Sequence, residues 1–467
     1  MDHDAIRERF VPFAERMRAA GLPELAIKIF QRHYERLLSG ERGFIPEQEI
    51  RPVSELPDAE ALGDAEADAG REVLPRTVTI KLNGGLGTSM GLERAKSLLR
   101  VKGELTFLDI IARQALSAGY ALLLMNSPHT RGDSLESLAR YRGLVRHGLP
   151  LDFQQHVVPK VAVDDLSPVR WPSDPRLEWC PPGHGDIYAA LQTSGVLEKL
   201  LAAGIEYACV SNADNLGATI DPAILGYFRN SGLTMLLEAA DRTESDQKGG
   251  HLAVGRDGRL LLREIAQCPP EDLPHHRDHR RHRFFGTNTI WLHLPSLRDE
   301  LASRGGVLEL PLICNRKTVD PRDPSSTPVY QLETAMGTAI SVFRKTGAIR
   351  VPRSRFAPVK TTNDLLGVRS DAYELTCDFR VVLAPTRDAP PFIDLDPAHY
   401  KMIDQLESRF PCGEPSLIEC ERLRVLGDVR FGRGVRLRGS VTIRAEGGAP
   451  GFVPDGALIE GDYVCAV

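Results

Sequence analysis

Apolar residues near the start of the chain recur every three or four positions, which is the period of an amphipathic helix. They form two groups: Ile6, Phe10, Phe13 and Met17, then Ile27, Phe30, Tyr34, Leu37 and Leu38. The acidic, proline-bearing stretch from Pro52 to Arg71 lacks this period and predicts a surface linker. Residues 1–74 are therefore expected to form a helical N-terminal segment followed by a linker.

From residue 75 to residue 395, short apolar runs alternate with amphipathic ones. The apolar runs predict strands at Thr77–Leu82, Tyr120–Met125, Tyr207–Val210 and Thr234–Glu238. The amphipathic runs predict helices at Phe107–Ala118, Ile187–Leu201 and Ala223–Phe228. This alternation predicts an α/β core, with a mainly parallel sheet covered by helices on both faces. An inserted hairpin is expected at Leu252–Val254 and Leu260–Ile265, joined by the Asp257-Gly258 turn.

The pattern changes again in the last part of the chain, where apolar residues stand six apart in two interlocked series. The first series is Leu423, Val429, Val435 and Val441, and the second is Val425, Phe431, Leu437 and Ile443. Such a repeat places one inward-facing pair on each short face of a parallel β-helix. Residues 396–467 are therefore expected to form a linker helix and a C-terminal β-helix domain, with Gly427, Gly434 and Gly439 at the corners.

Composition narrows the class of protein. The 467 residues are 42% hydrophobic and 26% charged, as in ordinary folded proteins, and the length suits two or three domains of about 150 residues. A net charge of −5 and a pI near 6.3 provide no field that attracts nucleic acid or an acidic membrane. Any bound phosphate must therefore be held by a local site.

Localisation is predicted from what the sequence lacks. No apolar run is long enough to span a bilayer, and the acidic start Met1–Asp4 does not resemble a signal peptide. The eight cysteines contain no CxxC pair, which argues against a disulfide framework and a thiolate zinc site. These features together predict a cytoplasmic protein.

The segment Lys81–Thr88 (KLNGGLGT), directly after a predicted strand, is the strongest candidate for chemistry. Glycines let the backbone approach a ligand, and consecutive amide hydrogens can hold phosphate oxygens. The terminal Gly-Lys-Ser/Thr of a Walker A loop is absent, and Gly91 comes one residue too late for a Rossmann loop. We expect a phosphate- or nucleotide-binding loop of another kind, with a tight structural turn as the alternative.

Two further segments combine polar residues with turn residues. Pro181–Asp186 (PPGHGD) opens a predicted helix, and it is either an anion or sugar site or a helix entry capped by Asp186. Ser211–Asn215 follows a strand, at the sheet edge where ligands bind in open α/β folds. A carboxylate there, Asp214, is a candidate Mg²⁺ ligand, and an Asx turn is the alternative.

The run His275–Arg283 (HHRDHRRHR) gathers histidine and arginine. It offers groups for phosphate or metal, but its histidine spacing matches no ordered zinc arrangement, and a solvated loop is the expected structure. By contrast, Glu264, Asn288 and Lys360 are unremarkable as single polar residues and gain meaning only from their order in the chain.

Taken together, these segments resemble the eukaryotic-type UTP–glucose-1-phosphate uridylyltransferases (UDP-glucose pyrophosphorylases). The similarity runs in order from about residue 75 to residue 462. The resembling blocks are Lys81–Gly91, Pro181–Asp186, Asn212–Gly217, Lys248–Gly250, Glu264–Gln267, Gln331–Thr334 and Val351–Lys360. The resemblance implies a Rossmann-like mixed-sheet nucleotidyltransferase core with a helical N-terminal segment and a C-terminal parallel β-helix cap.

The resemblance also implies roles for single residues. The nucleotide would be bound by Leu82, Asn83, Gly84, Gly85, Lys96, Gln155, Gly183 and Asp214, with Gln155 and Gly183 reading uracil. The sugar phosphate would be bound by His184, Asn212, Ala213, Glu264, Asn288 and Lys360. Asp214 would hold Mg²⁺, Lys96 would contact the phosphates, and Lys360 would be the catalytic cation.

In such enzymes the phosphate oxygen of glucose-1-phosphate attacks the α-phosphorus of UTP, and UDP-glucose and pyrophosphate form reversibly with Mg²⁺. Three departures from the family pattern concern the site: Leu92–Ala95 replaces a cysteine and Gly-Pro, Ala213 replaces a serine, and Gly286–Thr289 replaces Asn-Thr-Asn-Asn. A broader UDP-sugar or UDP-N-acetylhexosamine pyrophosphorylase and an inactive nucleotide-binding relative are the alternatives. A homo-oligomer contact through the β-helix is a further expectation from the family.

Overall fold

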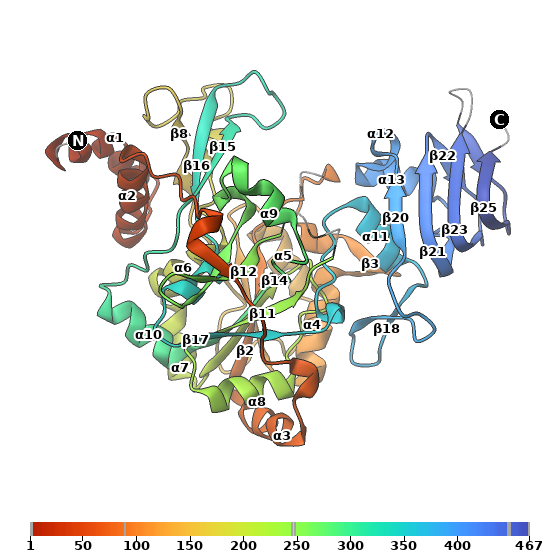
Figure 1. The fold of residues 1–467 in the computed structure, drawn as a ribbon, viewed down its shortest axis with the longest axis horizontal. Coiled ribbons are helices and arrows are strands. Elements are labelled where there is room, and N and C mark those ends of the chain that lie inside the picture. The colour runs from red at the N-terminus through yellow and green to blue at the C-terminus, as the bar shows by residue number, and fades with distance from the viewer. Residues whose placement is uncertain (1–2, 88–89, 244–245, 247–248, 446–449, 466–467) are drawn as a thin grey trace.

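The computed structural model describes residues 3–87, 90–243, 246, 249–445 and 450–465. Two helices begin the chain, α1 (His3–Ala19) and α2 (Glu24–Leu38), as the apolar period predicts. Their buried faces meet in an aromatic cluster in which the rings of Phe13 and Tyr34 lie 4.8 Å apart between centroids. The pair packs against a three-stranded antiparallel sheet of β15 (Ile313–Thr318), β16 (Pro328–Glu333) and β8 (Val161–Ala162) (Figure 1).

The expected surface linker at residues 52–71 is wrong for its second half. Residues Asp64–Val73 form helix α3, which packs on α8 (Pro222–Ser231). The helices approach so closely because glycines face one another: a Cβ on Gly70 would lie 1.8 Å from the carbonyl oxygen of Pro222, and one on Gly226 would lie 1.8 Å from that of Glu66. The acidic composition describes only the exposed face of α3, so it does not reveal the buried contact.

The centre of the molecule is a ten-stranded sheet. Its main path runs β1 (Ile50–Pro52), β12 (His251–Gly255), β14 (Phe284–His293), β10 (Tyr207–Asn212), β2 (Thr77–Asn83), β5 (Ala121–Asn126) and β6 (Asp152–Gln154). Strands β11 (Met235–Asp241) and β17 (Thr346–Arg350) extend from β14, and β13 (Leu260–Arg263) pairs with β12. Pairing is parallel through β10, β2, β5 and β6 but antiparallel around β14. The core is therefore α/β as predicted. Its sheet is mixed, as the family resemblance implies, whereas the alternation of strands and helices predicts a mainly parallel one.

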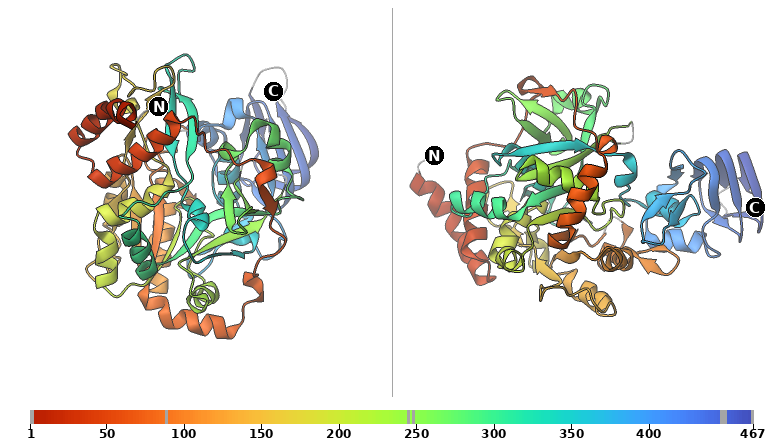
Figure 2. Two further views of the ribbon diagram at one scale, coloured as in Figure 1. Left: turned by 60° about the vertical axis from the view of Figure 1, so that its left-hand side comes forward. Right: turned by 90° about the horizontal axis from the view of Figure 1, so that it is seen from below.

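Helices cover both faces of this sheet, as predicted (Figure 2). One face packs against α6 (Ile187–Thr193), α7 (Val196–Ala202) and α10 (Leu294–Ser303), and the other packs against α3 and α8. The single helix expected at Ile187–Leu201 is two helices, because Gly195 adopts a left-handed conformation with φ +69° between them. The hairpin of β12 and β13 is confirmed.

The core contains further helices and strands. They are α4 (Phe107–Ala118), α5 (Arg131–Leu138), α9 (Leu273–Arg277), α11 (Thr362–Arg369), β3 (Arg100–Lys102), β4 (Leu105–Thr106), β7 (Val158–Pro159), β9 (Trp179–Cys180), β18 (Tyr373–Leu375) and β19 (Val381–Leu383). Among the described helices, none has both the length and the apolar character that crossing a bilayer requires.

The C-terminal strands pair in parallel. One sheet contains β20 (Phe392–Leu395), β21 (Ser416–Leu426), β23 (Arg436–Ala445) and β25 (Leu458–Cys465), and a second contains β22 (Val429–Phe431) and β24 (Gly451–Val453). Leu423 stands beside Val441 and Val425 beside Ile443, so the two six-residue series are in register. All eight members are buried, as the pattern predicts.

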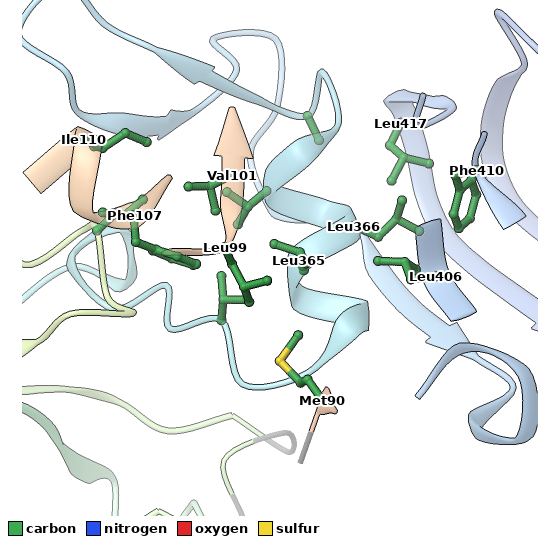
Figure 3. Packing of buried hydrophobic residues seen from close by; sticks show 14 of the residues in the cluster. Met90, Leu99, Val101, Phe107, Ile110, Leu365, Leu366, Leu406, Phe410 and Leu417 are labelled. Atoms are coloured by element: carbon green, nitrogen blue, oxygen red, sulfur yellow. The ribbon is translucent and has the colours of Figure 1, made fainter. Parts of the chain in front are cut away.

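Two short helices, α12 (Pro397–Tyr400) and α13 (Ile403–Arg409), lie beside these strands. The apolar interior continues from the strands into the core: Leu406, Phe410 and Leu417 belong to the same cluster as Leu366 and Phe107 (Figure 3). The C-terminal strands and this side of the α/β core therefore share one hydrophobic interior.

Candidate active site

The carboxyl ends of three parallel strands bring the polar segments together. Register pairs Leu82 on β2 with Asn212 on β10, and Asn83 with Asn126 on β5. The glycine loop after β2 and the Asp214 turn after β10 therefore start side by side, at the edge where open α/β sheets bind ligands. A Cβ on Gly85 would meet nothing within 4 Å, so this part of the loop has room for a ligand. Thr88 lies outside the described residues.

Asn83 and Ala213 point away from this edge. The Asn83 side chain is buried, and its Nδ2 donates to Oδ1 of Asn126 and to Oγ of Ser134, each at 2.8 Å. Nδ2 of Asn126 in turn donates to Asp152 at 3.2 Å. The methyl group of Ala213 lies in the hydrophobic core. Any ligand contact of Asn83 or Ala213 is left to the backbone.

Gln155 and Gly183 form a second part of the site. Nε2 of Gln155 donates to the Gly183 carbonyl at 2.8 Å, and the Gln155 backbone N–H donates to the Asn126 carbonyl at 2.8 Å. Gly183 has φ +81°, and a Cβ there would lie 2.3 Å from the carbonyl oxygen of Thr334, so only glycine fits. On Gly84, a Cβ would lie 2.8 Å from Oε1 of Gln155. The two segments predicted to read a base are therefore in direct contact with each other and with the glycine loop.

Asp186 is not the helix cap that was the alternative for its segment, because its side chain makes no cap hydrogen bond. It accepts instead from the backbone N–H of His156 and lies 2.8 Å from Nδ1 of the same residue. Nε2 of His156 lies 3.0 Å from Oγ1 of Thr193. Asp186 thus ties the Gly183 segment to the residue next to Gln155.

His184 is held as a neutral imidazole. Its Nδ1 accepts from the backbone N–H of Met336 at 3.0 Å, and burial lowers the pKa of the ring to about 4. With Nδ1 occupied as an acceptor, the proton of the neutral ring is on Nε2, which is the atom free to donate to a ligand.

Lys96 and Asp214 form an ion pair, with Nζ 2.6 Å from Oδ2. The backbone N–H of Lys96 donates to the Gly85 carbonyl, so the pair lies against the glycine loop. Oδ1 of Asp214 is buried and has no hydrogen-bond partner among the described residues. A carboxylate with one unsatisfied oxygen suits a cation that takes its other ligands from phosphate and water, as Mg²⁺ does. The part of the chain that the structure describes holds no cluster of three metal-ligating side chains.

The sugar-phosphate candidates lie on neighbouring elements. Nδ2 of Asn288 donates to Oδ1 of Asn212 at 2.8 Å, and Asn288 adopts φ +58°, an uncommon backbone conformation for a residue other than glycine. Glu264 follows β13, and a Cβ on Gly250 would lie 2.7 Å from its Oε2. Burial raises the pKa of Glu264, and the positive charge of Lys360 opposes that shift. Lys248, in the block before Gly250, is outside the described residues.

Lys81 is a residue whose role sequence reasoning missed. It lies in β2 with its side chain buried, and Nζ donates to Oγ of Ser211 and to the carbonyl of Ala218, each at 2.7 Å. Burial lowers the pKa of Lys81 to about 8. The available signal was a lysine inside an apolar strand, which calls for a buried partner. Lys81 therefore holds the two ends of the Asp214 turn through Ser211 and Ala218, and its side chain is not on the surface of the glycine loop.

The expectation of a solvated loop at His275–Arg283 is wrong for two of its residues. His276 and His282 are fully buried, and the ring of His282 stacks on that of His251 with centroids 3.8 Å apart. Nε2 of His282 lies 2.9 Å from Glu47, which also accepts from the buried Arg263 at 2.7 Å. The sequence pattern could not show this, because Glu47 and Arg263 are distant in the chain.

Comparison with known proteins agrees with this geometry. Residues 27–438 match the family model described as UTP–glucose-1-phosphate uridylyltransferase. The chain is 38% identical to the enzyme of that name from Solanum tuberosum, over 89% of this chain and 84% of the relative, and 39% identical to that from Hordeum vulgare, over 91% and 90%.

Solved structures give the same result. A mutant UDP-glucose pyrophosphorylase from Leishmania major, in complex with UDP-glucose, superposes with a TM-score of 0.91 at 44% identity, covering 97% of this chain and 99% of the other. A Trypanosoma brucei structure named UDP-glucose phosphorylase gives 0.90 at 44% identity, covering 98% and 99%. With its site geometry, its family match and these relatives in agreement, the chain belongs to the UTP–glucose-1-phosphate uridylyltransferase family.

Proposed function

We propose that the protein transfers the uridylyl group of UTP to glucose-1-phosphate, giving UDP-glucose and pyrophosphate in a reversible reaction. The observation that carries this proposal is the meeting, at one sheet edge, of the glycine loop, the Gln155–Gly183 contact and the Lys96–Asp214 pair. The family match and the relatives' names support the same reaction. Transfer of this kind needs alignment and charge neutralisation more than covalent catalysis.

Uracil recognition is assigned to Gln155 and Gly183. Because Nε2 of Gln155 already donates to Gly183, its Oε1 remains as an acceptor for the N3–H of uracil. The backbone N–H of Gly183 supplies a donor for a uracil carbonyl. A site with fixed donors and acceptors of this kind rejects bases that leave buried groups unpaired.

The phosphates are assigned to the backbone of Leu82, Asn83, Gly84 and Gly85 and to the Lys96 ammonium. Asp214 is assigned as the Mg²⁺ ligand through its unsatisfied Oδ1. A bound Mg²⁺ would neutralise phosphate charge and help to align the triphosphate. With Mg²⁺ held by Asp214, the Lys96 ammonium would be available to a phosphate oxygen of the nucleotide in place of its carboxylate partner.

Glucose-1-phosphate is assigned to the other side of the Asp214 turn. Asn212, Asn288, the Ala213 backbone and Nε2–H of His184 supply donors, and Glu264 accepts from sugar hydroxyls. Lys360, as the catalytic cation, contacts both phosphate groups while the oxygen of the sugar phosphate forms a bond to the α-phosphorus. The bond from that phosphorus to the bridging oxygen breaks, and pyrophosphate leaves with the electron pair.

The finer organisation of the chain is part of the proposal. We assign residues 1–74 to a helical N-terminal segment whose β1 and α3 pack on the core. Residues 75–395 are assigned to the nucleotidyltransferase core, and residues 396–467 to a linker helix and parallel β-helix domain. The in-register six-residue series supports the β-helix. The exposed apolar residues Phe452, Leu458 and Val464 support a homo-oligomer contact through it. A cytoplasmic location is supported by the eight cysteines, all unpaired.

The decisive experiment measures pyrophosphate release by the purified protein with Mg²⁺, UTP and glucose-1-phosphate, and the reverse reaction from the products. Activity with UTP well above that with ATP or GTP is expected. Comparable rates with all three nucleotides would contradict the uracil assignment. Galactose-1-phosphate and N-acetylglucosamine-1-phosphate, assayed in parallel, test whether glucose is the preferred sugar.

A further inference from the structure

Two segments carrying the proposed metal ligand and the proposed catalytic cation are joined by one side chain. Asn215, next to Asp214, is buried, and its Nδ2 donates to the carbonyl of Arg355 at 3.1 Å. Its Oδ1 accepts from the backbone N–H of Ala357 at 3.1 Å. The amide therefore uses both ends to bridge to the segment that leads to Lys360.

The backbones of the two segments also meet directly. The N–H of Val359 donates to the carbonyl of Asp214 at 3.2 Å. Asn215 and Pro358 form an isolated antiparallel β-bridge. A Cβ on Gly217 would lie 2.5 Å from the carbonyl oxygen of Ser354, so the contact depends on a glycine. The peptide unit next to Lys360 is thus hydrogen-bonded to that of the proposed metal ligand.

A buried ion pair anchors this junction to the sheet. Arg355 donates to the fully buried Glu238 of β11 at 2.9 Å and 2.6 Å, and to the carbonyl of Thr219 at 2.9 Å. Nε1 of Trp291, on β14, donates to the same carboxylate at 2.9 Å. Two neighbouring strands therefore fix Arg355, and Arg355 fixes the carbonyl that Asn215 binds.

We infer that Asn215 is a positioning residue that sets the place of Lys360 relative to Asp214, an inference that rests on the roles proposed for those two residues. Asn215 is buried, so it acts through the backbone of its partner segment. Without its amide, the N–H of Ala357 and the carbonyl of Arg355 lose their partners, and the segment shifts to satisfy them. A displacement of about 1 Å of a group that must align two phosphates costs roughly 10²-fold in rate.

The test compares Asn215→Ala with Lys360→Ala in a double-mutant cycle. Asn215→Ala is expected to lower kcat roughly 10- to 100-fold while KM for UTP changes less than about threefold. In the Lys360→Ala background the same substitution is expected to cost less than about threefold, because no cation remains to be misplaced. Asn215→Asp, which keeps the shape but cannot donate to Arg355, serves where the alanine variant folds poorly and is expected to show the same loss.

Gln114→Ala is the matched control, because Gln114 is also a buried amide that donates to a carbonyl of another segment, that of Phe379 at 2.8 Å. It is expected to lower thermal stability without changing kcat. Equal losses from Asn215→Ala with and without Lys360 would overturn the positioning role alone. A fully active Lys360→Ala enzyme would overturn the proposed cation, and the positioning role with it.

Discussion

The polar edge of the central sheet and the parallel C-terminal strands are stabilised in opposite ways. At the edge, buried charged groups such as Lys81, Glu238 and Arg355 each have named partners at fixed distances. In the C-terminal strands, eight apolar residues in register fill the interior, and their stabilisation comes from shared burial. Function at the edge therefore depends on individual atoms, whereas the strands depend on shared burial and exclude charge.

The largest effect is expected from Lys360, which tests whether a single atom controls rate at the edge. Lys360→Ala and Lys360→Arg are each expected to lower kcat by roughly 10²–10³, the scale for one transition-state contact. Arginine does not rescue because a guanidinium is a broad planar fork, whereas the ammonium is compact. Only 11 of the 58 basic residues are lysine, so a lysine here is informative. Steady-state turnover of both variants, with UTP binding measured by calorimetry, provides the test.

Lys345→Arg is the control for that experiment, because Lys345 is also an exposed lysine but has no proposed role. Its turnover is expected to equal that of the unmodified protein. High activity of Lys360→Arg would show that charge alone suffices and that the cation site is not closely fitted.

The next effect concerns the C-terminal strands. Val435→Asp places an unpaired carboxylate in their interior and is expected to lower the free energy of unfolding by about 3 kcal/mol or more. Its neighbour Arg436 is exposed, and Arg436→Asp is expected to change the free energy of unfolding by less than about 0.5 kcal/mol. Urea unfolding followed by circular dichroism measures both. Equal stability of the two variants would contradict the inward-facing series.

Acid sensitivity distinguishes the two regions further. Burial lowers the pKa of His33, His184 and His276 to about 4, while an unfolded histidine titrates near 6.5. The folded protein therefore binds fewer protons than the unfolded chain in this window. The part of the folding stability that comes from these neutral rings is fully present above pH 6.5. It is lost as the pH falls toward 4, by up to about 3 kcal/mol for each fully buried ring.

The loss should arise outside the C-terminal strands, because no histidine follows His399 in the sequence. Urea titrations at pH 7 and pH 5 measure it. His33→Leu, which removes one buried ring, is expected to reduce the difference, and the exposed His129→Leu is expected to leave it unchanged. An unchanged difference in the His33 variant would contradict its neutral burial.

The smallest expected effect concerns the Lys96–Asp214 pair. In the absence of nucleotide the ammonium competes with a divalent cation for the carboxylate, so Lys96→Gln should bind Mn²⁺ about tenfold more tightly. Electron paramagnetic resonance of free Mn²⁺ measures this without any turnover. Asp214→Asn should abolish the gain, and Lys345→Gln should show none. Weaker Mn²⁺ binding by Lys96→Gln would mean that the cation binds elsewhere.

The sequence predicted the α/β core, the hairpin and the buried six-residue series because each depends on local periodicity. The family resemblance also assigned Gln155 and Gly183 to one part of the site, and these two residues are in contact. It could not show that the side chain of Asn83 turns inward, since its partners Asn126 and Ser134 are distant in sequence. Helix α3 was missed for a similar reason: its contact with α8 depends on two glycines that composition treats as turn residues.

The shared interior of the C-terminal strands and the core has an evolutionary consequence. Recombination that separated the chain near residue 396 would leave Leu366 and Phe107 on one fragment without the apolar neighbours Phe410 and Leu417 on the other. Both fragments would expose apolar surface and aggregate. Selection should therefore keep the two parts together in one gene. Insertions and deletions should be confined to exposed turns between strands.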